Sequence, residues 1–210
     1  MMVEGVEGGE GGEGAARELR VAVLASGRGS NLRNLVERGY HVVAVATNRP
    51  GCGAAAIAAE QGIDLGTFPQ REFASREERD EALERWLAER RPELVVLAGY
   101  DRVVSPSLVR AFAGRILNLH PSLLPAFAGG MDAVERALEH GVKITGCTVH
   151  LVTEDVDEGP IILQATVPVL EGDTVDTLHR RIQVEEHRIL PEAIDCMGAR
   201  RAQESASLGQ

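Results

Sequence analysis

The sequence predicts an α/β fold: a mostly parallel sheet with helices on both faces and an antiparallel strand pair near the C-terminus. Short apolar runs of strand length alternate with segments in which apolar residues recur at helical spacing. Later, residues 145–152 and 161–169 form two such runs joined by an acidic loop instead of a helix, which favours antiparallel pairing. Apolar parallel strands need cover on both sides, so we expect helices on each face.

Two strand–helix units open the predicted sheet. Residues 21–25 form an apolar run that stops at the turn SGRGSN, after which Leu32, Leu35 and Val36 recur at helical spacing. The elements expected next are a strand at 41–47, an alanine-rich helix at 53–61 and a short strand at 64–68.

A charged helix follows these two units. Residues 75–90 place Leu83, Trp86 and Leu87 on one helical face, and a buried strand is expected at 94–99. The elements expected next are a strand from Arg115, the rigid loop SLLPAFAGG, a helix at 132–139 and a last long helix that begins after Asp173. Pro191 is expected to kink or end this helix because proline lacks the backbone donor that a helix needs.

The chain length fits one domain. At 210 residues, of which 44% are hydrophobic, it can form one sizeable core, which we place at residues 19–198. Residues 1–18, rich in glycine and glutamate, are expected to be a disordered tail, and residues 199–210 a flexible one. No signal peptide and no apolar run of membrane length is recognisable, so we predict a cytoplasmic protein.

The charge and the cysteine content limit the kinds of partner, metal site and disulfide that we expect. Lys and Arg number 22 against 32 Asp and Glu, a formal charge of −10, so we expect neither nucleic acid nor a membrane surface as a partner. The three cysteines, Cys52, Cys147 and Cys196, are scattered, without the spacing of a zinc site or a disulfide framework. Reduced thiols and no bound metal are therefore expected.

The first candidate site is the turn SGRGSN, where a strand enters a helix. Free amides at a helix start, glycines that allow close approach, and the polar side chains of Ser30 and Asn31 suit a phosphate. The alternative is a tight turn in which Ser30 or Asn31 simply caps the helix. The turn matches neither the dinucleotide pattern G-x-G-x-x-G nor a nucleoside-triphosphate loop with its lysine.

The second candidate site is Asn118 and His120, at the carboxyl end of a predicted parallel strand. Residues two apart on a strand point to one face, so both side chains can reach the same atom. An amide and a protonated imidazole together form a donor pair for a developing oxyanion. A structural polar pair at a strand end is the alternative.

The third candidate is the loop at 153–160, which holds four carboxylates between two apolar strands. A solvated turn, a calcium site and a single carboxylate beside His120 all remain open at this point. In the last case the carboxylate raises the affinity of the imidazole for a proton.

In order and spacing, these elements resemble the glycinamide ribonucleotide formyltransferase family. The resemblance covers about residues 20–195 and is carried by VLASGRGSNL, VVLAGYDRVVSP, ILNLHPSLLPAF, TGCTVHLV and VDEGPIILQ. It implies the Rossmann-like formyltransferase fold. It also implies transfer of a formyl group, without a metal, from the co-substrate 10-formyltetrahydrofolate to the amine of glycinamide ribonucleotide in purine biosynthesis. Asn118, His120 and Asp157 match the catalytic set.

The resemblance also implies the binding residues. Those similar to the positions that contact the nucleotide are Gly29, Ser30, Asn31, Gln183, Val184, Glu185 and Glu186. Those similar to the folate-binding positions are Arg76, Asp101, Arg102, Val103, Val104 and Asn118.

The chain departs from the family pattern in two places. The family often has an apolar residue where Asp101 stands, so this segment is expected to hold the pterin through its backbone. After Pro125, the sequence AFAGGMDA lacks a common Pro-Gly-x-His pattern and is one residue longer. We expect His150 to be a structural histidine bonded within the site wall. The ordinary surface or packing role is expected of His41, His140, His179 and His187.

Other classes of protein share parts of this pattern. A formyltetrahydrofolate deformylase-like hydrolase resembles the same centre but usually carries an N-terminal regulatory domain. Methionyl-tRNA formyltransferase usually adds a nucleic-acid-binding domain, for which neither length nor charge is present. A nucleotide-binding module or a dinucleotide oxidoreductase would not require Asn118, His120 and Asp157 together. We expect small-molecule substrates and a monomer or homodimer.

Overall fold

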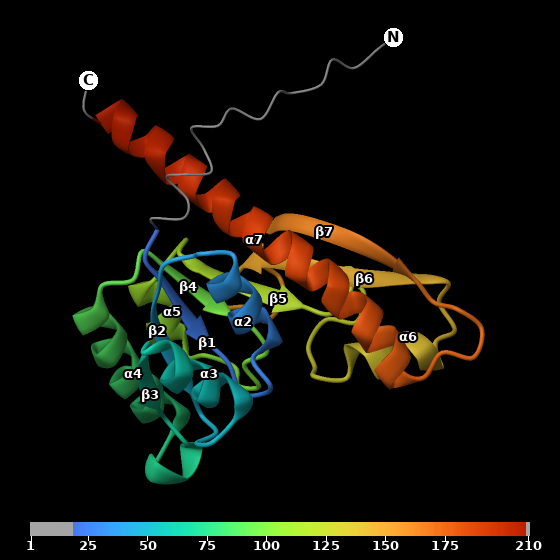
Figure 1. The fold of residues 1–210 in the computed structure, drawn as a ribbon, viewed down its shortest axis with the longest axis horizontal. Coiled ribbons are helices and arrows are strands. Elements are labelled where there is room, and N and C mark those ends of the chain that lie inside the picture. The colour runs from blue at the N-terminus through green and yellow to red at the C-terminus, as the bar shows by residue number, and fades with distance from the viewer. Residues whose placement is uncertain (1–18, 209–210) are drawn as a thin grey trace.

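A seven-stranded sheet forms the centre of the protein in a computed structural model that describes residues 19–208 (Figure 1). The strand order is β3-β2-β1-β4-β5-β6-β7. The first five strands run parallel, and β6 and β7 are added antiparallel, as predicted. The strands are β1 (Val21–Leu24), β2 (Val42–Thr47), β3 (Asp64–Thr67), β4 (Leu94–Leu97), β5 (Ile116–His120), β6 (Ile144–Leu151) and β7 (Ile161–Pro168). The predicted tail at residues 1–18 lies outside the described residues.

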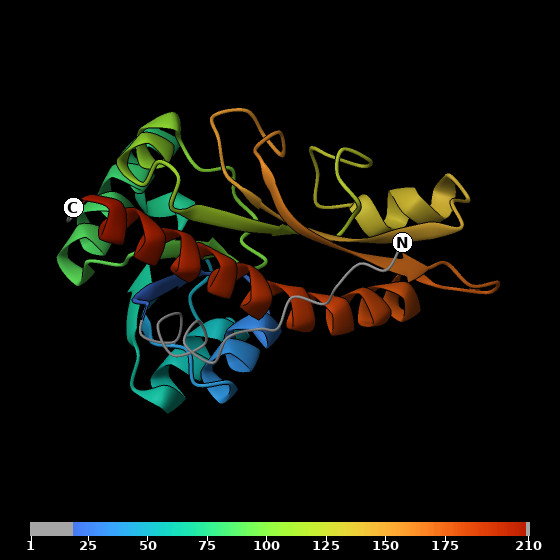
Figure 2. The same ribbon diagram turned by 90° about the horizontal axis from the view of Figure 1, so that it is seen from above.

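Helices cover both faces of the sheet, and the alternation of side chains along each strand divides the core in two (Figure 2). In β1, Val21 and Val23 pack with α2, α3 and α7, whereas Ala22 and Leu24 pack with α4 and α5. The helices are α2 (Ser30–Glu37), α3 (Gly53–Gln61), α4 (Arg76–Arg90), α5 (Pro106–Ala111), α6 (Ala133–Glu139) and α7 (Val175–Leu208), with a 3₁₀ turn at Gln70–Glu72. The expected α/β architecture is therefore confirmed.

The prediction missed helix α5 and the 3₁₀ turn. Helix α5 carries its own start signal, because Ser105 accepts a hydrogen bond from the Leu108 amide at 3.4 Å and Pro106 stands in the first turn. With six residues, the helix is too short to show a helical period in the sequence.

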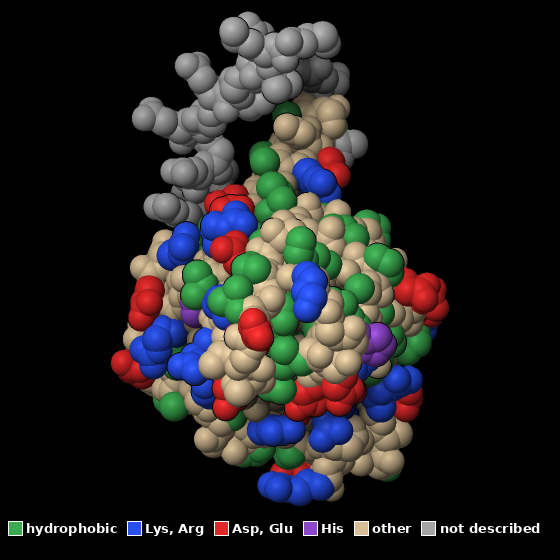
Figure 3. All heavy atoms as spheres, turned by 90° about the vertical axis from the view of Figure 1, so that its right-hand side faces the viewer, with side chains coloured by type: hydrophobic (Ala, Val, Ile, Leu, Met, Phe, Trp, Pro, Cys, Tyr) green, Lys and Arg blue, Asp and Glu red, His purple; other side chains and the backbone are tan. Residues whose placement is uncertain are grey.

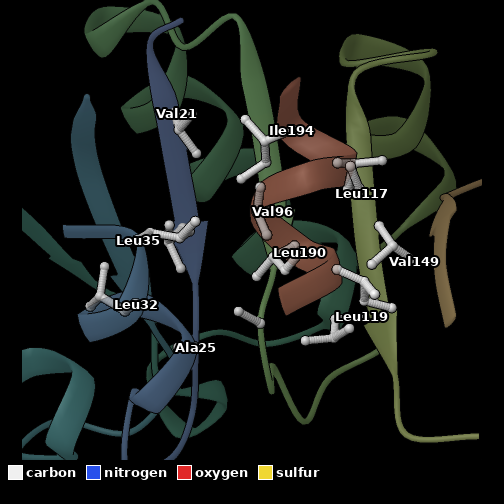
Figure 4. Packing of buried hydrophobic residues seen from close by; sticks show 14 of the residues in the cluster. Val21, Ala25, Leu32, Leu35, Val96, Leu117, Leu119, Val149, Leu190 and Ile194 are labelled. Carbon is white, nitrogen blue, oxygen red and sulfur yellow. The ribbon is translucent and has the colours of Figure 1, made fainter. Parts of the chain in front are cut away.

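Helix α7 runs through Pro191 to Leu208, so of the two predicted outcomes, a kink or an end at Pro191, the end is wrong. Proline removes the bond that the carbonyl of His187 would otherwise accept. The Asn34 side chain of α2 donates to that carbonyl at 2.8 Å and so takes the place of the missing donor. Leu190 and Ile194 on this helix pack against Val96 and Leu117 of the sheet (Figure 4).

The residues expected to form a flexible C-terminal tail continue α7 as far as Leu208. In Figure 1 this end of the helix extends past the sheet. No helix within residues 19–208 combines the length and the apolar character that a membrane span requires. Acidic and basic side chains are interspersed on the face shown in Figure 3.

A buried ion pair braces α4 against the segment that leads into α5. The Arg79 guanidinium donates to Asp80 Oδ1 at 2.8 Å and to the carbonyl of Val103 at 3.3 Å. Asp80 accepts in addition from the Ser105 amide at 2.5 Å. Because both charged side chains are almost fully buried, each one depends on the other for compensation.

We therefore expect Asp80→Ala to cost about 3 to 5 kcal/mol of unfolding free energy, because it leaves a buried guanidinium unpaired. Urea denaturation measures this loss. The control Asp64→Ala removes an exposed partner of Arg90 and should cost less than about 1 kcal/mol. Equal losses in the two variants would contradict the bracing role of Asp80.

Candidate active site

A cavity of about 820 Å³ lies at the carboxyl edge of the sheet. Its lining residues come from the segments that follow β1 and β4, from β5 and β6, from the loop between β6 and β7, and from the start of α7. Parallel strands all end at this edge, which is where open α/β sheets bind their ligands.

The turn between β1 and α2 lines one part of the cavity. Gly29, with φ of 77°, caps α2 without a side-chain hydrogen bond, so the alternative in which Ser30 or Asn31 caps the helix is wrong. The first amides of α2 consequently have no side-chain cap, and such amides favour an anion. Arg28 and Ser30 line the cavity beside them.

The two glycines of this turn have different roles. A Cβ on Gly29 would lie 2.8 Å from the Cα of Ala54, so this glycine allows α2 to pack closely on α3. A Cβ on Gly27 would meet nothing within 4 Å, and Gly27 lines the cavity. Gly27, which the prediction did not single out, is therefore the glycine that leaves room for a ligand.

Helix α7 presents one face to the cavity. Gln183 and Glu186 line it, whereas Val184 is 66% exposed and Glu185 pairs with Arg188 at 2.8 Å. Successive helical residues are about 100° apart. Of the four binding residues predicted at 183–186, two therefore line the cavity, whereas Val184 and Glu185 do not.

Glu186 is buried in this wall. Its carboxylate accepts a hydrogen bond from Asn31 Nδ2 at 3.1 Å. Burial raises the pKa of Glu186, and the Asn31 bond opposes this shift only in part. A carboxyl group with a raised pKa beside the amides of α2 suits hydrogen bonding to neutral hydroxyl groups of a ligand.

His179 lines the cavity although we expected an ordinary surface or packing role. Its spacing to Gln183 and Glu186 is i, i+4 and i+7, which is the signal that places all three on one helical face. Burial lowers the pKa of His179, and the charge of Arg28 lowers it further.

The segment after β4 supplies another wall. Asp101, Arg102, Val103 and Val104 all line the cavity, and Val103 is 53% exposed. Arg76, in contrast, lies at the exposed start of α4, pairs with Glu77 at 3.0 Å and does not line the cavity. The predicted folate positions are therefore brought together, apart from Arg76.

The polar centre of the cavity is built by two antiparallel strands. Asn118 and His120 lie on β5, and the register pairs Asn118 with His150 and His120 with Thr148 on β6. Asn118 Nδ2 lies 3.0 Å from His150 Nε2. His150 is bonded within the site wall, as expected, and it also belongs to the polar centre.

Asp157 is the carboxylate of the acidic loop that turns inward. Its oxygens lie 3.5 Å from His120 Nδ1 and 3.6 Å from His150 Nε2, and the Gly129 amide donates to it at 2.8 Å. Its backbone has a φ of 59°, in the left-handed region that only a few non-glycine residues adopt. Glu154 instead pairs with Arg110 at 2.8 Å, and Asp155 and Glu158 are exposed.

Hydrogen bonds define the tautomer of His150. Nδ1 lies 3.0 Å from the carbonyl of Leu151, so it carries the proton. Nε2 is then the acceptor for Asn118 Nδ2. The second hydrogen of that amide points toward Asp157 Oδ1 at 3.4 Å, a longer and weaker bond.

His120 faces an acceptor on each ring nitrogen. Nδ1 faces Asp157, and Nε2 lies 3.2 Å from the carbonyl of Phe127 in the loop that departs from the family pattern. Burial nevertheless lowers the pKa of His120, and Asp157 raises it only in part. The predicted effect of a carboxylate on His120 is therefore present, but the loss of solvation outweighs it and the net shift of the pKa is downward.

Asp157 stays ionised in this environment. Burial alone would raise its pKa, but the nearby His150 imidazole, the Gly129 amide and the charge of His120 together hold the pKa below its usual range. Within residues 19–208, no group of three or more His, Cys, Asp or Glu side chains is arranged to hold a metal ion.

The fold and this site define a class, a doubly wound α/β protein with a polar cavity at the carboxyl edge of the sheet. A family model described as formyl transferase matches residues 19–194. The chain belongs to the formyl transferase family.

Named relatives support the assignment. The chain is 47% identical over 180 residues to a phosphoribosylglycinamide formyltransferase of Mycobacterium tuberculosis, covering 83% of each chain. The crystal structure of glycinamide ribonucleotide transformylase 1 from Symbiobacterium toebii is 48% identical with a TM-score of 0.84, over 88% of this chain and 90% of that one. The trifunctional purine biosynthetic protein adenosine-3 of Bos taurus is 42% identical over 189 residues, 87% of this chain but only 19% of the relative.

We expect an NMR titration to place the pKa of His120 below that of an exposed histidine, and lower still in Asp157→Asn, which removes the charge that opposes burial. Glu158→Gln removes a charge from the exposed part of the same loop and should leave the titration unchanged. A His120 pKa that rises in Asp157→Asn would refute this electrostatic description.

Proposed function

We propose that the protein transfers the formyl group of 10-formyltetrahydrofolate to the amine of glycinamide ribonucleotide in purine biosynthesis. The observation that carries the proposal is the cluster of Asn118, His120 and Asp157 at the centre of a cavity that also contains an anion-binding turn. The names of the relatives point to the same reaction.

In this reaction a neutral amine attacks the formyl carbon, and the carbonyl oxygen becomes negative in the tetrahedral intermediate. Asn118 Nδ2 and His120 Nε2 are the donors that we assign to this oxygen. The oxyanion replaces the acceptors that now occupy them, Asp157 Oδ1 at 3.4 Å and the Phe127 carbonyl at 3.2 Å. Both bonds are long enough to be exchanged at little cost.

The negative charge that develops on the carbonyl oxygen also compensates for the lowered pKa of His120. A nearby negative charge raises the pKa of an imidazole, so the intermediate itself favours the imidazolium form that Asp157 already supports. We assign to Asp157 a second task, the ordering of a water that carries the proton of the attacking amine to the folate nitrogen. The bond between that nitrogen and the formyl carbon then breaks.

Three parts of the cavity are assigned to the two substrates. The turn from Gly27 to Asn31, which includes Gly29 and Ser30, holds the nucleotide phosphate, and Gln183 and Glu186 hold the ribose and glycinamide part. The segment at 101–104 holds the folate. Arg76, Val184 and Glu185 are omitted because they lie outside the lining.

The proposal also includes the cellular location, the oligomeric state and the bounds of the catalytic domain. We place the enzyme in the cytoplasm, acting on small molecules as a monomer or homodimer, with residues 19–198 as the catalytic domain. The alternative is hydrolysis of the folate donor by the same centre. The anion-binding turn favours transfer, because a hydrolase has no need for a second, phosphorylated substrate.

A direct assay tests the proposal. Purified protein mixed with glycinamide ribonucleotide and 10-formyltetrahydrofolate should yield the formylated nucleotide and tetrahydrofolate. Without the nucleotide, formate should appear slowly or not at all. Rapid release of formate in that control would instead establish the hydrolase.

We expect His120→Ala and Asp157→Asn each to lower kcat by about a hundredfold or more, the loss typical for removal of an oxyanion donor. The double variant should be little worse than either single variant, because the two residues act as one unit. Steady-state kinetics measures this.

The control for this series is Glu158→Gln, an exposed residue of the same loop that does not line the cavity. Its kcat should stay close to that of the unaltered enzyme. A double variant whose loss equals the product of the two single losses would show that His120 and Asp157 act independently.

We expect Gly27→Val to raise the KM of the nucleotide at least about tenfold and that of the folate much less, because the new side chain projects into open cavity space. Gly29→Val is unsuitable for this purpose, since its Cβ would collide with Ala54. Equal changes in both KM values for Gly27→Val would argue against a phosphate site in the turn.

A further inference from the structure

The carboxylate of Asp101 is fully engaged by protein groups. Asn48 Nδ2 donates to its Oδ1 at 2.7 Å, the Arg49 guanidinium pairs with its Oδ2, and Arg102 Nε lies 3.5 Å from Oδ1. The side chain is only 13% exposed. A carboxylate with these partners has little capacity left for a ligand in the cavity.

These contacts form part of a closed ring. The Asp101 amide donates to Ser26 Oγ at 2.9 Å, Ser26 Oγ donates to Asn48 Oδ1 at 2.5 Å, and Asn48 Nδ2 returns to Asp101. Ser26 and Asn48 are both buried. Hydrogen bonds in such a buried circuit polarise and strengthen one another.

The ring joins the ends of three strands that are distant in the sequence. Ser26 follows β1 and directly precedes the turn assigned to the nucleotide phosphate. Asn48 follows β2, and Asp101 opens the segment assigned to the folate. The same three hydrogen bonds therefore connect the two substrate subsites.

The far end of the folate segment is anchored separately. Arg79 donates to the carbonyl of Val103 at 3.3 Å, and the Ser105 amide donates to Asp80 at 2.5 Å. Asp101 at one end and the Arg79–Asp80 pair at the other thus hold the backbone between them, with Val103 exposed to the cavity. An apolar side chain at position 101, which the family often has, cannot form the first anchor.

From this geometry we propose that Asp101 is a positioning residue: through Asn48, Arg49 and Ser26 it holds the folate segment in register with the phosphate turn, and its carboxylate does not contact the folate. This inference rests on the proposed function for the identity of the two substrates. It assigns to the departure at position 101 a role that the family pattern does not contain.

Asp101→Asn tests the ring, because it keeps the shape but removes the charge that binds Arg49. We expect the KM of the folate donor to rise about tenfold, as for loss of one charge-assisted hydrogen bond, while kcat changes less than about threefold. In the protein without substrates, the amide of residue 101, which donates to Ser26 Oγ at 2.9 Å, should exchange with solvent about tenfold faster. The matched control Asp64→Asn, on a carboxylate paired with Arg90 at 2.7 Å outside the cavity, should change neither quantity.

The double variant Asn48→Asp/Asp101→Asn separates positioning from direct contact. It reverses the bond between the two side chains, keeps an acceptor for Ser26 and retains a negative charge beside Arg49. Both the donor KM and the amide exchange should return to within about threefold of the unaltered enzyme. A double variant as impaired as Asp101→Asn would overturn the proposal, because a carboxylate needed at position 101 itself would then contact the folate.

The two readouts keep this inference distinct from the proposed function. If the unaltered enzyme transferred no formyl group, the proposed function would fail, and amide exchange in the ligand-free protein would still decide the role of the ring. Unchanged exchange of the residue 101 amide in Asp101→Asn would overturn the positioning role, whatever the activity.

Discussion

The antiparallel register between β5 and β6 is the constraint on which the reaction centre depends. It sets Asn118 opposite His150 and brings their side chains within 3.0 Å. The chain then leaves β6 and returns through the acidic loop, where the left-handed backbone of Asp157 directs its carboxylate between two imidazoles, at 3.5 and 3.6 Å. A slip of one residue in this pairing would turn every one of these strand side chains to the other face of the sheet.

Within that geometry, burial and charge act in opposite directions on His120. Burial lowers its pKa, while Asp157 and the Phe127 carbonyl each favour the protonated ring. The balance keeps the pKa of the ligand-free imidazole below its usual value, and a developing oxyanion would raise it. In the reaction that we propose, His120 would therefore become the strongest donor at the stage that forms the oxyanion. His150 lies 3.0 Å from the Leu151 carbonyl through Nδ1 and 3.0 Å from Asn118 Nδ2 through Nε2, contacts that fix the orientation of the Asn118 amide.

Much of the fold followed from periodicity, and the failures had both local and long-range causes. Alternating strands and helices predicted the sheet, and the acidic connection predicted the antiparallel pair. Helix α7 passes Pro191 only because Asn34, on a different helix, bonds the freed carbonyl, which no local pattern reveals. In the site, the strand period placed Asn118 and His120 together, but the residues alone left four carboxylates open. The resemblance pointed to Asp157, and the loop conformation brings its carboxylate within 3.5 Å of His120. The resemblance predicts Val184 and Glu185 as nucleotide contacts together with their neighbours. The helical period instead turns both side chains away from the cavity.

The most direct test is a crystal structure of the enzyme with a stable tetrahedral adduct that links the nucleotide amine to the folate. The adduct oxygen that represents the former carbonyl should lie within about 3 Å of both Asn118 Nδ2 and His120 Nε2. Asp157 should remain beside the imidazole, and the phosphate should lie on the turn that contains Gly27 and Ser30. An oxygen bound elsewhere in the cavity, with Asn118 and His120 still bonded to Asp157 and Phe127, would contradict the assignment of these two side chains as the oxyanion donors.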